Sequence, residues 1–173
     1  MRVLETPRLT LEPQVVAHAE ELFVVLCDPA IYEYENQPPR SLDWFRARLA
    51  KLESRRSPDA REQWLNWAVR LRASTLIGYV QATVAADGRA LIAYELASAH
   101  WGQGLGYEAT NAMVRELQDR YGVRAMAALF KKANHRSRRL LQRLGFSPGP
   151  PERYVEHHVE PDEDLMLRPS AAG

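Results

Sequence analysis

The stretch His100–Ala109 reads HWGQGLGYEA, in which three glycines alternate with other residues. The apolar run Leu91–Ala97 stands before it and is typical of a strand. A helical pattern follows, and Gly122 ends it. Its apolar face carries Ala109, Ala112, Met113, Leu117 and Tyr121. The sequence therefore predicts a strand, a glycine-rich turn and a helix.

The glycine turn predicts a phosphate site. Glycine lets the backbone approach a ligand closely because it has no Cβ. A helix that begins at such a turn offers free N–H groups, and its dipole favours anions. Gly102, Gly104 and Gly106 match neither the G-x-G-x-x-G spacing of dinucleotide folds nor the Gly-Lys-Ser/Thr of a nucleotide P-loop. On the glycines alone, a tight turn without a ligand is an equal alternative.

A second stretch, Asn134–Phe146, reads NHRSRRLLQRLGF and predicts a helix that Asn134 begins and Gly145 caps. Together the two stretches resemble the GNAT superfamily of acyl-CoA N-acyltransferases, in its RimJ/RimL-like branch. WGQGLGYEA is similar to that family's pyrophosphate loop, and the second stretch to its Asn-x-x-Ser and Leu-Gly-Phe motif. The resemblance extends from Glu5 to Arg168.

The resemblance implies an α/β (α+β) fold: a mixed, mostly antiparallel central sheet flanked by helices, whose fourth and fifth strands splay apart. We expect a single acetyltransferase domain over residues 1–173, because this length allows a sizeable core. The patterns predict strands at Arg8–Glu12, Leu65–Leu71 (half-buried), Leu76–Val84, Leu91–Ala97 and Arg124–Phe130, helices at His18–Cys27 and Leu42–Glu53, and a closing strand pair at Arg153–Val159 and Leu165–Arg168.

The composition is ordinary for a soluble globular protein, with 46% hydrophobic and 26% charged residues and a net charge of +1. Nothing in this balance requires nucleic acid or a membrane surface as a partner. We expect a cytoplasmic protein, because the sequence shows neither a signal-peptide core nor a membrane-spanning apolar run. The single cysteine, Cys27, fits a reducing compartment and is expected to be buried.

The resemblance implies acetyl-CoA as cosubstrate and no metal. The pantetheine arm would lie between the splayed strands and the pyrophosphate on the glycine turn. The expected cofactor-binding residues are Leu96, Ala97, Trp101, Gly102, Gln103, Gly104, Leu105, Gly106, Tyr107, Asn134, Ser137 and Arg139. The backbone near Leu96 and Ala97 would donate to the pantetheine and the acetyl carbonyl. Arg139 belongs to a basic cluster, part of which would lie near the 3′-phosphate; a solvated helix face is the simpler alternative. The cluster comprises Lys131, Lys132, Arg136, Arg138, Arg139 and Arg143.

Two residues are expected to act in catalysis. Ser137 would donate to the cofactor sulfur, because Leu141 stands where many family members carry a tyrosine as general acid. A solvated helical serine is the competing interpretation. Glu156 is expected to be the base or to position a water, because the predicted strand would fix it more rigidly than a loop. Glu95 and Glu33 are its rivals.

The predicted function is N-acetyl transfer from acetyl-CoA to a primary amine by direct attack in a ternary complex. The partner is a small-molecule or peptide amine, with no nucleic acid and no membrane; a homodimer is left open. Tyr32–Glu35 and Glu156–Asp164 are expected to flank the acceptor entrance, unless both are merely solvated loops. The alternatives are a non-catalytic acyl-CoA-binding or regulatory module, and an RNA-associated protein that uses the basic helix after Asn134.

Overall fold

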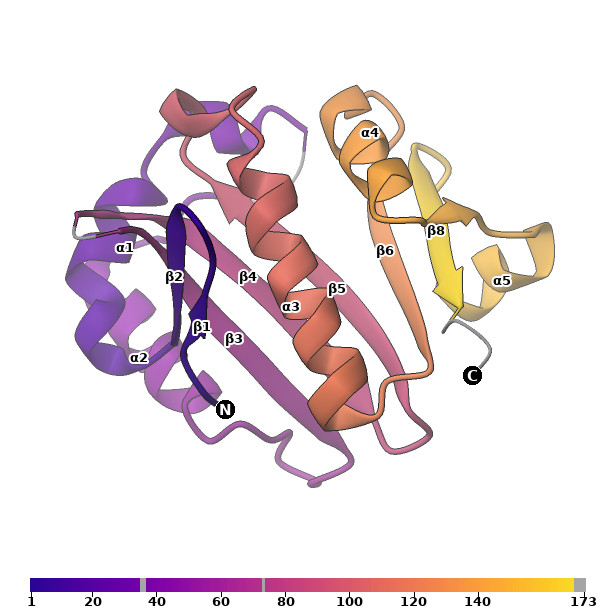
Figure 1. Ribbon diagram of the computed structural model, residues 1–173, viewed down its shortest axis with the longest axis horizontal. Helices are drawn as coiled ribbons and strands as arrows, with labels where there is room; N and C mark the ends of the chain where they lie inside the picture. Colours follow the sequence, from indigo (N-terminus) through magenta and orange to yellow (C-terminus); the bar gives the residue numbers. More distant parts are fainter. Residues whose placement is uncertain (35–36, 73, 170–173) are drawn as a thin grey trace.

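The computed structural model describes residues 1–34, 37–72 and 74–169. They form one eight-stranded sheet in the order β1-β2-β3-β4-β5-β6-β8-β7, with helices on both faces (Figure 1). The strands are β1 Leu4–Glu5, β2 Leu9–Pro13, β3 Glu62–Leu71, β4 Leu76–Ala85, β5 Arg89–Leu96, β6 Ala125–Lys131, β7 Ser147–Pro148 and β8 Glu163–Pro169. The helices are α1 Ala19–Val25, α2 Leu42–Leu52, α3 Leu105–Tyr121, α4 His135–Arg143 and α5 Pro151–Glu156, with short 3-10 turns η1 Val16–His18, η2 Pro29–Tyr32 and η3 Ser98–His100.

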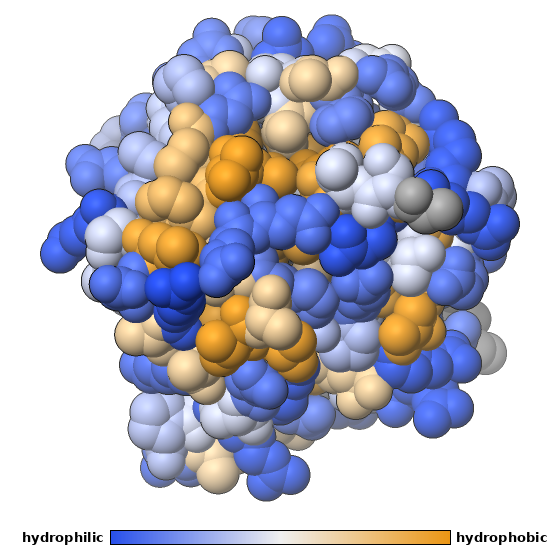
Figure 2. Space-filling view, turned by 90° about the vertical axis from the view of Figure 1, so that its left-hand side faces the viewer, coloured by the Kyte–Doolittle hydropathy of each residue, from blue (hydrophilic) through white to orange (hydrophobic). Residues whose placement is uncertain are grey.

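Two hydrophobic cores hold the layers together. On one face, α3 and α4 pack against the sheet around Met113 and Leu141, both of which are fully buried. On the other face, α1 and α2 pack through Leu22 and Leu49. Figure 2 shows the α1 and α2 side, where a band of hydrophilic side chains interrupts the hydrophobic patches. The sheet is therefore the middle of three layers.

Strand β3 is buried on both faces from Leu65 to Val69, so the expectation of a half-buried strand is wrong there. Asn66 and Ala68 are 3% and 0% exposed, like the apolar residues between which they alternate. Helices cover both sides of the sheet at this strand, so the alternation of polar and apolar residues does not indicate which side faces solvent.

The fourth and fifth predicted strands, Leu91–Ala97 and Arg124–Phe130, correspond to β5 and β6. They form the one parallel pair among the described strands, and the expected splay lies between them. Pairing extends only from Arg89, opposite Ala125, to Leu91, opposite Ala127. Beyond that point the strands diverge, while β6 pairs with β8 along its other edge (Figure 1). The facing edges of the diverging strands have no partner strand within the described chain.

The C-terminal region differs from the prediction. Residues Arg153–Val159 do not form a strand, because Pro151 begins helix α5 and this helix continues to Glu156. Proline suits the first turn of a helix, where its missing N–H costs nothing. The predicted strand Leu165–Arg168 is confirmed within β8, which pairs with β6 and with the short β7.

The predicted helix ends agree closely with the structure. Ser41 Oγ accepts a hydrogen bond of 3.1 Å from the Trp44 N–H and so caps α2. Gly122 ends α3 in the left-handed region, with φ of 62°. Cys27, by contrast, is exposed and not buried, because α1 ends before it at Val25. None of the helices in the described ranges is long and apolar enough to cross a membrane.

Candidate active site

The glycine turn places an uncapped helix end beside the splayed strands. Gly104 is the N-cap of α3 and adopts φ of 77°, and Gly102 adopts φ of 74°. No described side chain caps this helix, whose first backbone bond is from Glu108 N–H to the Gly104 carbonyl. The N–H groups of Leu105, Gly106 and Tyr107 therefore have no acceptor within the helix. Because α3 is 17 residues long, its dipole favours an anion at this end.

Side chains hold this turn in place. Arg8 donates to the Gln103 carbonyl at 2.9 Å and forms an ion pair of 2.7 Å with Glu108 in the first turn of α3. The Trp101 indole N–H donates to the Leu96 carbonyl at 2.8 Å, which ties the turn to the end of β5. The turn is thus fixed before any ligand arrives.

The absence of a side chain at Gly106 also matters for the packing of α3 against α4. A Cβ built there would lie 3.1 Å from Leu140 Cδ1 on α4. The residue therefore lets α3 and α4 approach each other, and a larger side chain would force them apart. Its place in the motif thus depends on helix packing as well as on any ligand.

Helix α4 begins at Asn134 beside the splay. The Asn134 Oδ1 accepts from the Ser137 backbone N–H at 3.0 Å, so this side chain is an N-cap, as expected. Its amide NH2 remains a donor for a ligand. Leu141 is fully buried in the core, so no polar group replaces the family's tyrosine at that position.

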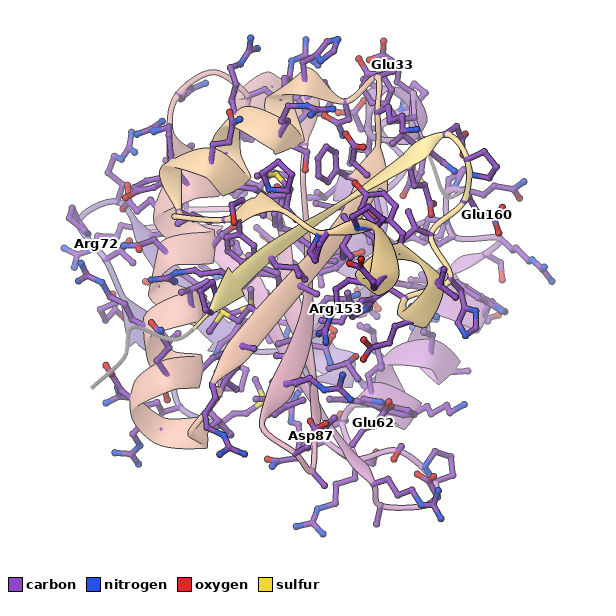
Figure 3. All side chains as sticks on the ribbon, turned by 90° about the vertical axis from the view of Figure 1, so that its right-hand side faces the viewer. Glu33, Glu62, Arg72, Asp87, Arg153 and Glu160 are labelled. Atoms are coloured by element: carbon purple, nitrogen blue, oxygen red, sulfur yellow. The ribbon has the colours of Figure 1, made fainter. Side chains whose placement is uncertain are left out.

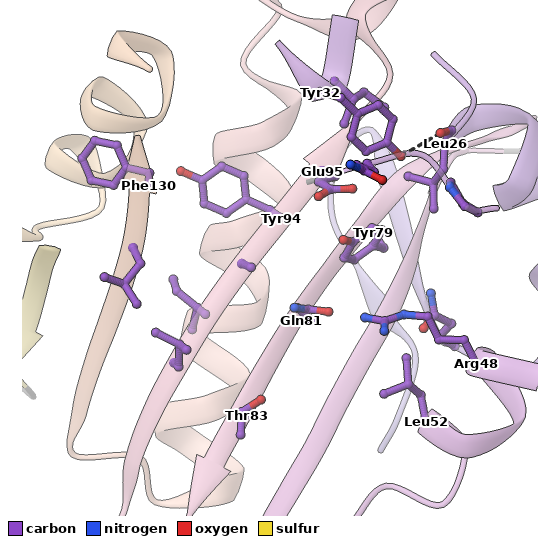
Figure 4. Close-up of a pocket in the computed structure, with 18 of the residues that line it drawn as sticks. Leu26, Tyr32, Arg48, Leu52, Tyr79, Gln81, Thr83, Tyr94, Glu95 and Phe130 are labelled. Carbon is purple, nitrogen blue, oxygen red and sulfur yellow. Dashed lines mark hydrogen bonds between the residues drawn. The ribbon is translucent and has the colours of Figure 1, made fainter. Parts of the chain in front are cut away.

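The Ser137 hydroxyl meets a tyrosine that the sequence analysis did not single out. Tyr94 Oη lies 2.7 Å from Ser137 Oγ, and either atom can be the donor. Figure 4 shows Tyr94 extending from β5 toward β6, across the diverging strands. The alternation of β5 predicts only that Tyr94 lies on the α3 face; that its hydroxyl reaches α4 depends on how far the strands diverge.

The two backbone residues expected to bind the cofactor arm differ in position. The Ala97 N–H donates to the Ile77 carbonyl of β4 at 2.8 Å, so it is already paired with that strand. Backbone groups alternate in direction along a strand, so the groups of Leu96 point toward the splay. The Leu96 carbonyl accepts from Trp101, and its N–H faces the same side.

The predicted basic cluster divides into two parts. Arg136 lies over the Trp101 ring at 4.6 Å and Arg143 over the Tyr107 ring at 4.4 Å, both next to the glycine turn. Arg139, on the same helix, is exposed. Lys131, however, pairs with Asp162 and Glu163 at 3.0 and 3.1 Å, and Arg138 pairs with Asp164. The acidic stretch thus neutralises part of the cluster and does not contribute to the pocket described next.

A pocket of about 500 Å³ opens on the α2 side of the sheet and reaches the splay (Figure 4). Helix α2, the segment around η2 and strands β4 to β6 form its walls. Asn134 and Ser137 of the α4 start also line it. The charged side chains among its described lining residues are Arg48 and Glu95. A substrate in this pocket would therefore meet one cation and one anion beside the Ser137 hydroxyl.

Glu95 lies in this pocket among tyrosines (Figure 4). Burial raises the pKa of Tyr79 well above its ordinary value, and the charge and hydrogen bond of Glu95 raise it further. Burial likewise raises the pKa of Tyr32, whose hydroxyl donates to the Leu26 carbonyl at 2.7 Å. Both phenols therefore remain neutral, and Tyr79 acts as a donor to the carboxylate.

The other two candidate bases lie elsewhere. Glu156 stands at the end of α5, where it pairs with Arg89 and, at 3.0 Å, with Arg153. Its hydrogen bond with Arg89 lowers the pKa of Glu156, and the residue does not line the pocket. The rigid strand on which its choice depended is not present. Glu33 is exposed at the upper edge, as Figure 3 shows.

Of the two segments expected to flank the acceptor entrance, the first contributes Tyr32 and Tyr34 to the pocket. Glu35 lies outside the described residues. The second segment, residues 156–164, contributes none of the pocket's described lining. No group of three or more His, Cys, Asp or Glu side chains within the described ranges is arranged to hold a metal ion.

Comparison with known proteins agrees with this geometry. The family model for the acetyltransferase (GNAT) domain matches residues 8–147. Among curated proteins, no sequence matches the chain. A solved structure of RimL, the ribosomal L7/L12 α-N-protein acetyltransferase, in complex with coenzyme A superposes with a TM-score of 0.83 at 14% identity, over 99% of both chains.

Two further structures show the same fold. The ribosomal-protein-S5-alanine acetyltransferase from Vibrio fischeri has a TM-score of 0.80 at 14% identity, over 97% of this chain and 96% of that one. The microcin C7 self-immunity acetyltransferase MccE, in complex with acetyl-CoA and AMP, has a TM-score of 0.78 at 16% identity, over 95% and 93%. These likenesses support the fold, and the matched family model shows the membership: the chain belongs to the GNAT family of acetyltransferases.

Proposed function

We propose that the protein transfers the acetyl group of acetyl-CoA to a primary amine by direct attack in a ternary complex. One observation carries this proposal: the uncapped end of α3 and the pocket containing Glu95 both adjoin the splay between β5 and β6. The cofactor would enter from the glycine turn, and the amine from the α2 side. The two reactants would meet beside Ser137.

The residues around the turn suit the parts of coenzyme A. The free N–H groups of Leu105, Gly106 and Tyr107 would bind the pyrophosphate. Arg139 and its neighbours on α4 would lie near the 3′-phosphate, and the Leu96 N–H and the Asn134 amide would bind the pantetheine arm. The Leu96 N–H would also stabilise negative charge on the acetyl oxygen as the amine attacks.

The thiolate would leave beside two hydroxyl groups. The amine nitrogen forms a bond with the acetyl carbon, the carbon–sulfur bond breaks, and the sulfur carries the electron pair away. If Tyr94 donates to Ser137 Oγ, the Ser137 proton is free to point at the sulfur. The Tyr94–Ser137 pair would thus supply a hydrogen-bond donor to the sulfur, a role that Leu141 cannot fill because its side chain has no polar group. A thiol with a pKa of about 8.5 benefits from such a donor as it departs.

Glu95 is our choice as proton acceptor, in place of Glu156. It lines the pocket, whereas Glu156 is bound by two arginines outside it. A primary amine with a pKa near ~10 is mostly protonated at neutral pH and must lose a proton before it attacks. Glu95, directly or through a water, would take that proton and hold the ammonium form beforehand.

Thiol release from acetyl-CoA in the presence of a panel of amines tests the proposal. We expect amine-dependent thiol release and an N-acetylated product of matching mass. Binding of acetyl-CoA without transfer to any amine would instead favour the non-catalytic acyl-CoA-binding module. A salt-dependent RNA gel shift tests the RNA-associated alternative. We expect the reaction to take place in the cytoplasm, because the exposed Cys27 thiol suits a reducing compartment.

A further inference from the structure

Arg48 is a pocket cation without a carboxylate partner. It projects from α2, and Figure 4 shows its guanidinium pointing over the sheet toward Gln81. Within the described residues it forms neither a hydrogen bond nor an ion pair; its ring contact is with Trp44, at 5.8 Å. Its neighbour Arg46, two residues earlier, pairs with both Glu20 and Asp43 on the outer surface. The difference marks Arg48 as a cation whose donors are available.

Arg48 and Glu95 both line the pocket, the first from helix α2 and the second from strand β5. Glu95 is opposite Tyr79 in the register of β4 and β5, and Gln81 lies two residues farther along β4. Two residues of a strand span about 7 Å. The positive charge of Arg48 lowers the pKa of Tyr79, against the effect of Glu95, so both charges act on the same phenol. A small molecule can therefore meet both charges at once.

From this arrangement we infer that the acceptor is a small amine that also carries an anionic group, a carboxylate or a phosphate. The inference rests on the proposed function and adds the class of substrate. The amine would be held at Glu95, next to the splay, and the anion would be held by the Arg48 guanidinium. A guanidinium binds carboxylate and phosphate oxygens through two parallel hydrogen bonds, which also fixes their orientation.

The same charges disfavour a polyamine. A second ammonium group would reach the part of the pocket that Arg48 occupies, where like charges repel. The described lining offers no second carboxylate to bind it. An amine without an anionic group, such as a decarboxylated amino acid, would lose the contact with Arg48 while keeping that with Glu95. Charge pattern, and not pocket size, is therefore the feature that selects the acceptor.

Matched acceptors test this inference. Initial rates are measured for an amino acid, its amide and its decarboxylated amine, and for aminoalkyl phosphates beside their amino alcohols. We expect the wild-type enzyme to favour the anionic member of each set by about 10-fold to 100-fold in kcat/KM, the usual effect of a charged hydrogen bond. The relative rates of carboxylates and phosphates then distinguish the two sources of the anion.

Substitutions assign the preference to Arg48. In Arg48→Gln the preference should disappear, because the KM of the anionic acceptors rises toward that of the acceptors without an anionic group. Arg48→Lys should keep part of the preference, because lysine retains the positive charge but lacks the two parallel N–H donors of the guanidinium. Arg46→Gln is the matched control: it removes a neighbouring cation of the same helix that does not line the pocket, and it should leave the preference intact.

A binding measurement separates this inference from the proposed function. Calorimetry follows the binding of an N-acetylated amino acid, a product of the expected class, to wild type and to Arg48→Gln. If binding needs Arg48 but no amine is acetylated, the proposed function fails and the anion site stands. If amines are acetylated and the anionic preference is absent, or is unchanged in Arg48→Gln, the inference is overturned and the proposed function stands.

Discussion

Tyr94 Oη lies 2.7 Å from Ser137 Oγ, which joins strand β5 to helix α4 across the diverging strands. The two residues are 43 positions apart in the chain, and each lines the pocket. A partly buried pair of hydroxyls at this position can pass a proton or share one, because each is both donor and acceptor. The contact thus gives Ser137 a defined role to test.

The first prediction concerns this pair. Ser137→Ala should lower kcat by roughly 10-fold to 100-fold, the range for loss of one general-acid or charged hydrogen-bond contact, while the Kd for acetyl-CoA changes little. Tyr94→Phe should have a smaller effect in the same direction. If the two act as one unit, the double variant should be no slower than Ser137→Ala. Additive effects in single-turnover kinetics would show that the hydroxyls act separately, and Tyr154→Phe serves as a distant control.

The second prediction concerns the base. Glu95→Gln should depress kcat/KM near neutral pH, and raising the pH should restore part of the loss, because free amine then becomes abundant. Glu156→Gln should keep the wild-type pH profile, since Glu156 is exposed and bound by Arg89 and Arg153. The pH dependence of kcat/KM for each variant is the measurement. A loss at neutral pH in Glu156→Gln, with Glu95→Gln unaffected, would return the role to Glu156.

The third prediction compares two glycines that have similar backbone conformations. Gly102 and Gly122 both adopt positive φ, 74° and 62°, and a Cβ at either would meet nothing within 4 Å. Asparagine tolerates this region, so both substitutions should fold. Gly102→Asn should weaken acetyl-CoA binding at least ~10-fold by placing a side chain where the phosphates approach. Gly122→Asn, at the far end of α3, should not; equal affinities by calorimetry would contradict the phosphate site.

Gly106→Val supports a fourth prediction, on stability. Its side chain would meet Leu140 Cδ1, so α3 and α4 must separate slightly. We expect a loss of about 1–3 kcal/mol in the free energy of unfolding, the usual cost of overpacking. Urea denaturation of Gly106→Val and of Gly106→Ala would measure it, with the smaller residue less affected. Any change in acetyl-CoA affinity must therefore be measured under conditions in which the variant is fully folded.

The fifth prediction is the response of stability to acid. The hydrogen bond from Arg70 lowers the pKa of Glu12, and the charges of Arg70 and His18 lower it further. A carboxyl group whose pKa is lower in the folded protein stabilises it above the unfolded value, about 4.3, and that contribution is lost as the pH falls through the folded value. Denaturant unfolding at pH 7 and pH 3 should therefore show a shallower acid dependence in Glu12→Gln.

Glu20→Gln is the control for that experiment. Glu20 is also paired with an arginine, but its side chain is 75% exposed, against 26% for Glu12. Exposed pairs contribute little to stability. The variant should therefore follow the wild-type acid dependence, and a change equal to that of Glu12→Gln would show that the effect is one of net charge.

The sequence by itself determined most of the fold. Alternation and turn residues predicted the strands from β2 to β6, since these signals act over a few neighbouring residues. Ser41 and Gly122 predicted helix ends because a cap depends on local hydrogen bonds and backbone angles. The failure around Val155 was also local in origin: an apolar and charged mixture suggested a strand there, whereas Pro151 favours a helix start.

The tertiary structure alone decided which side chains meet at the site. Burial of Asn66 and Ala68 depends on the two helical layers, and the contact between Tyr94 and Ser137 depends on where the strands diverge. Glu95, Arg48 and Glu156 are all ionisable residues that the sequence does not tell apart by position, yet the first two line the pocket and Glu156 is held by arginines outside it. Such differences arise from contacts between residues far apart in the chain, and local sequence patterns do not encode them.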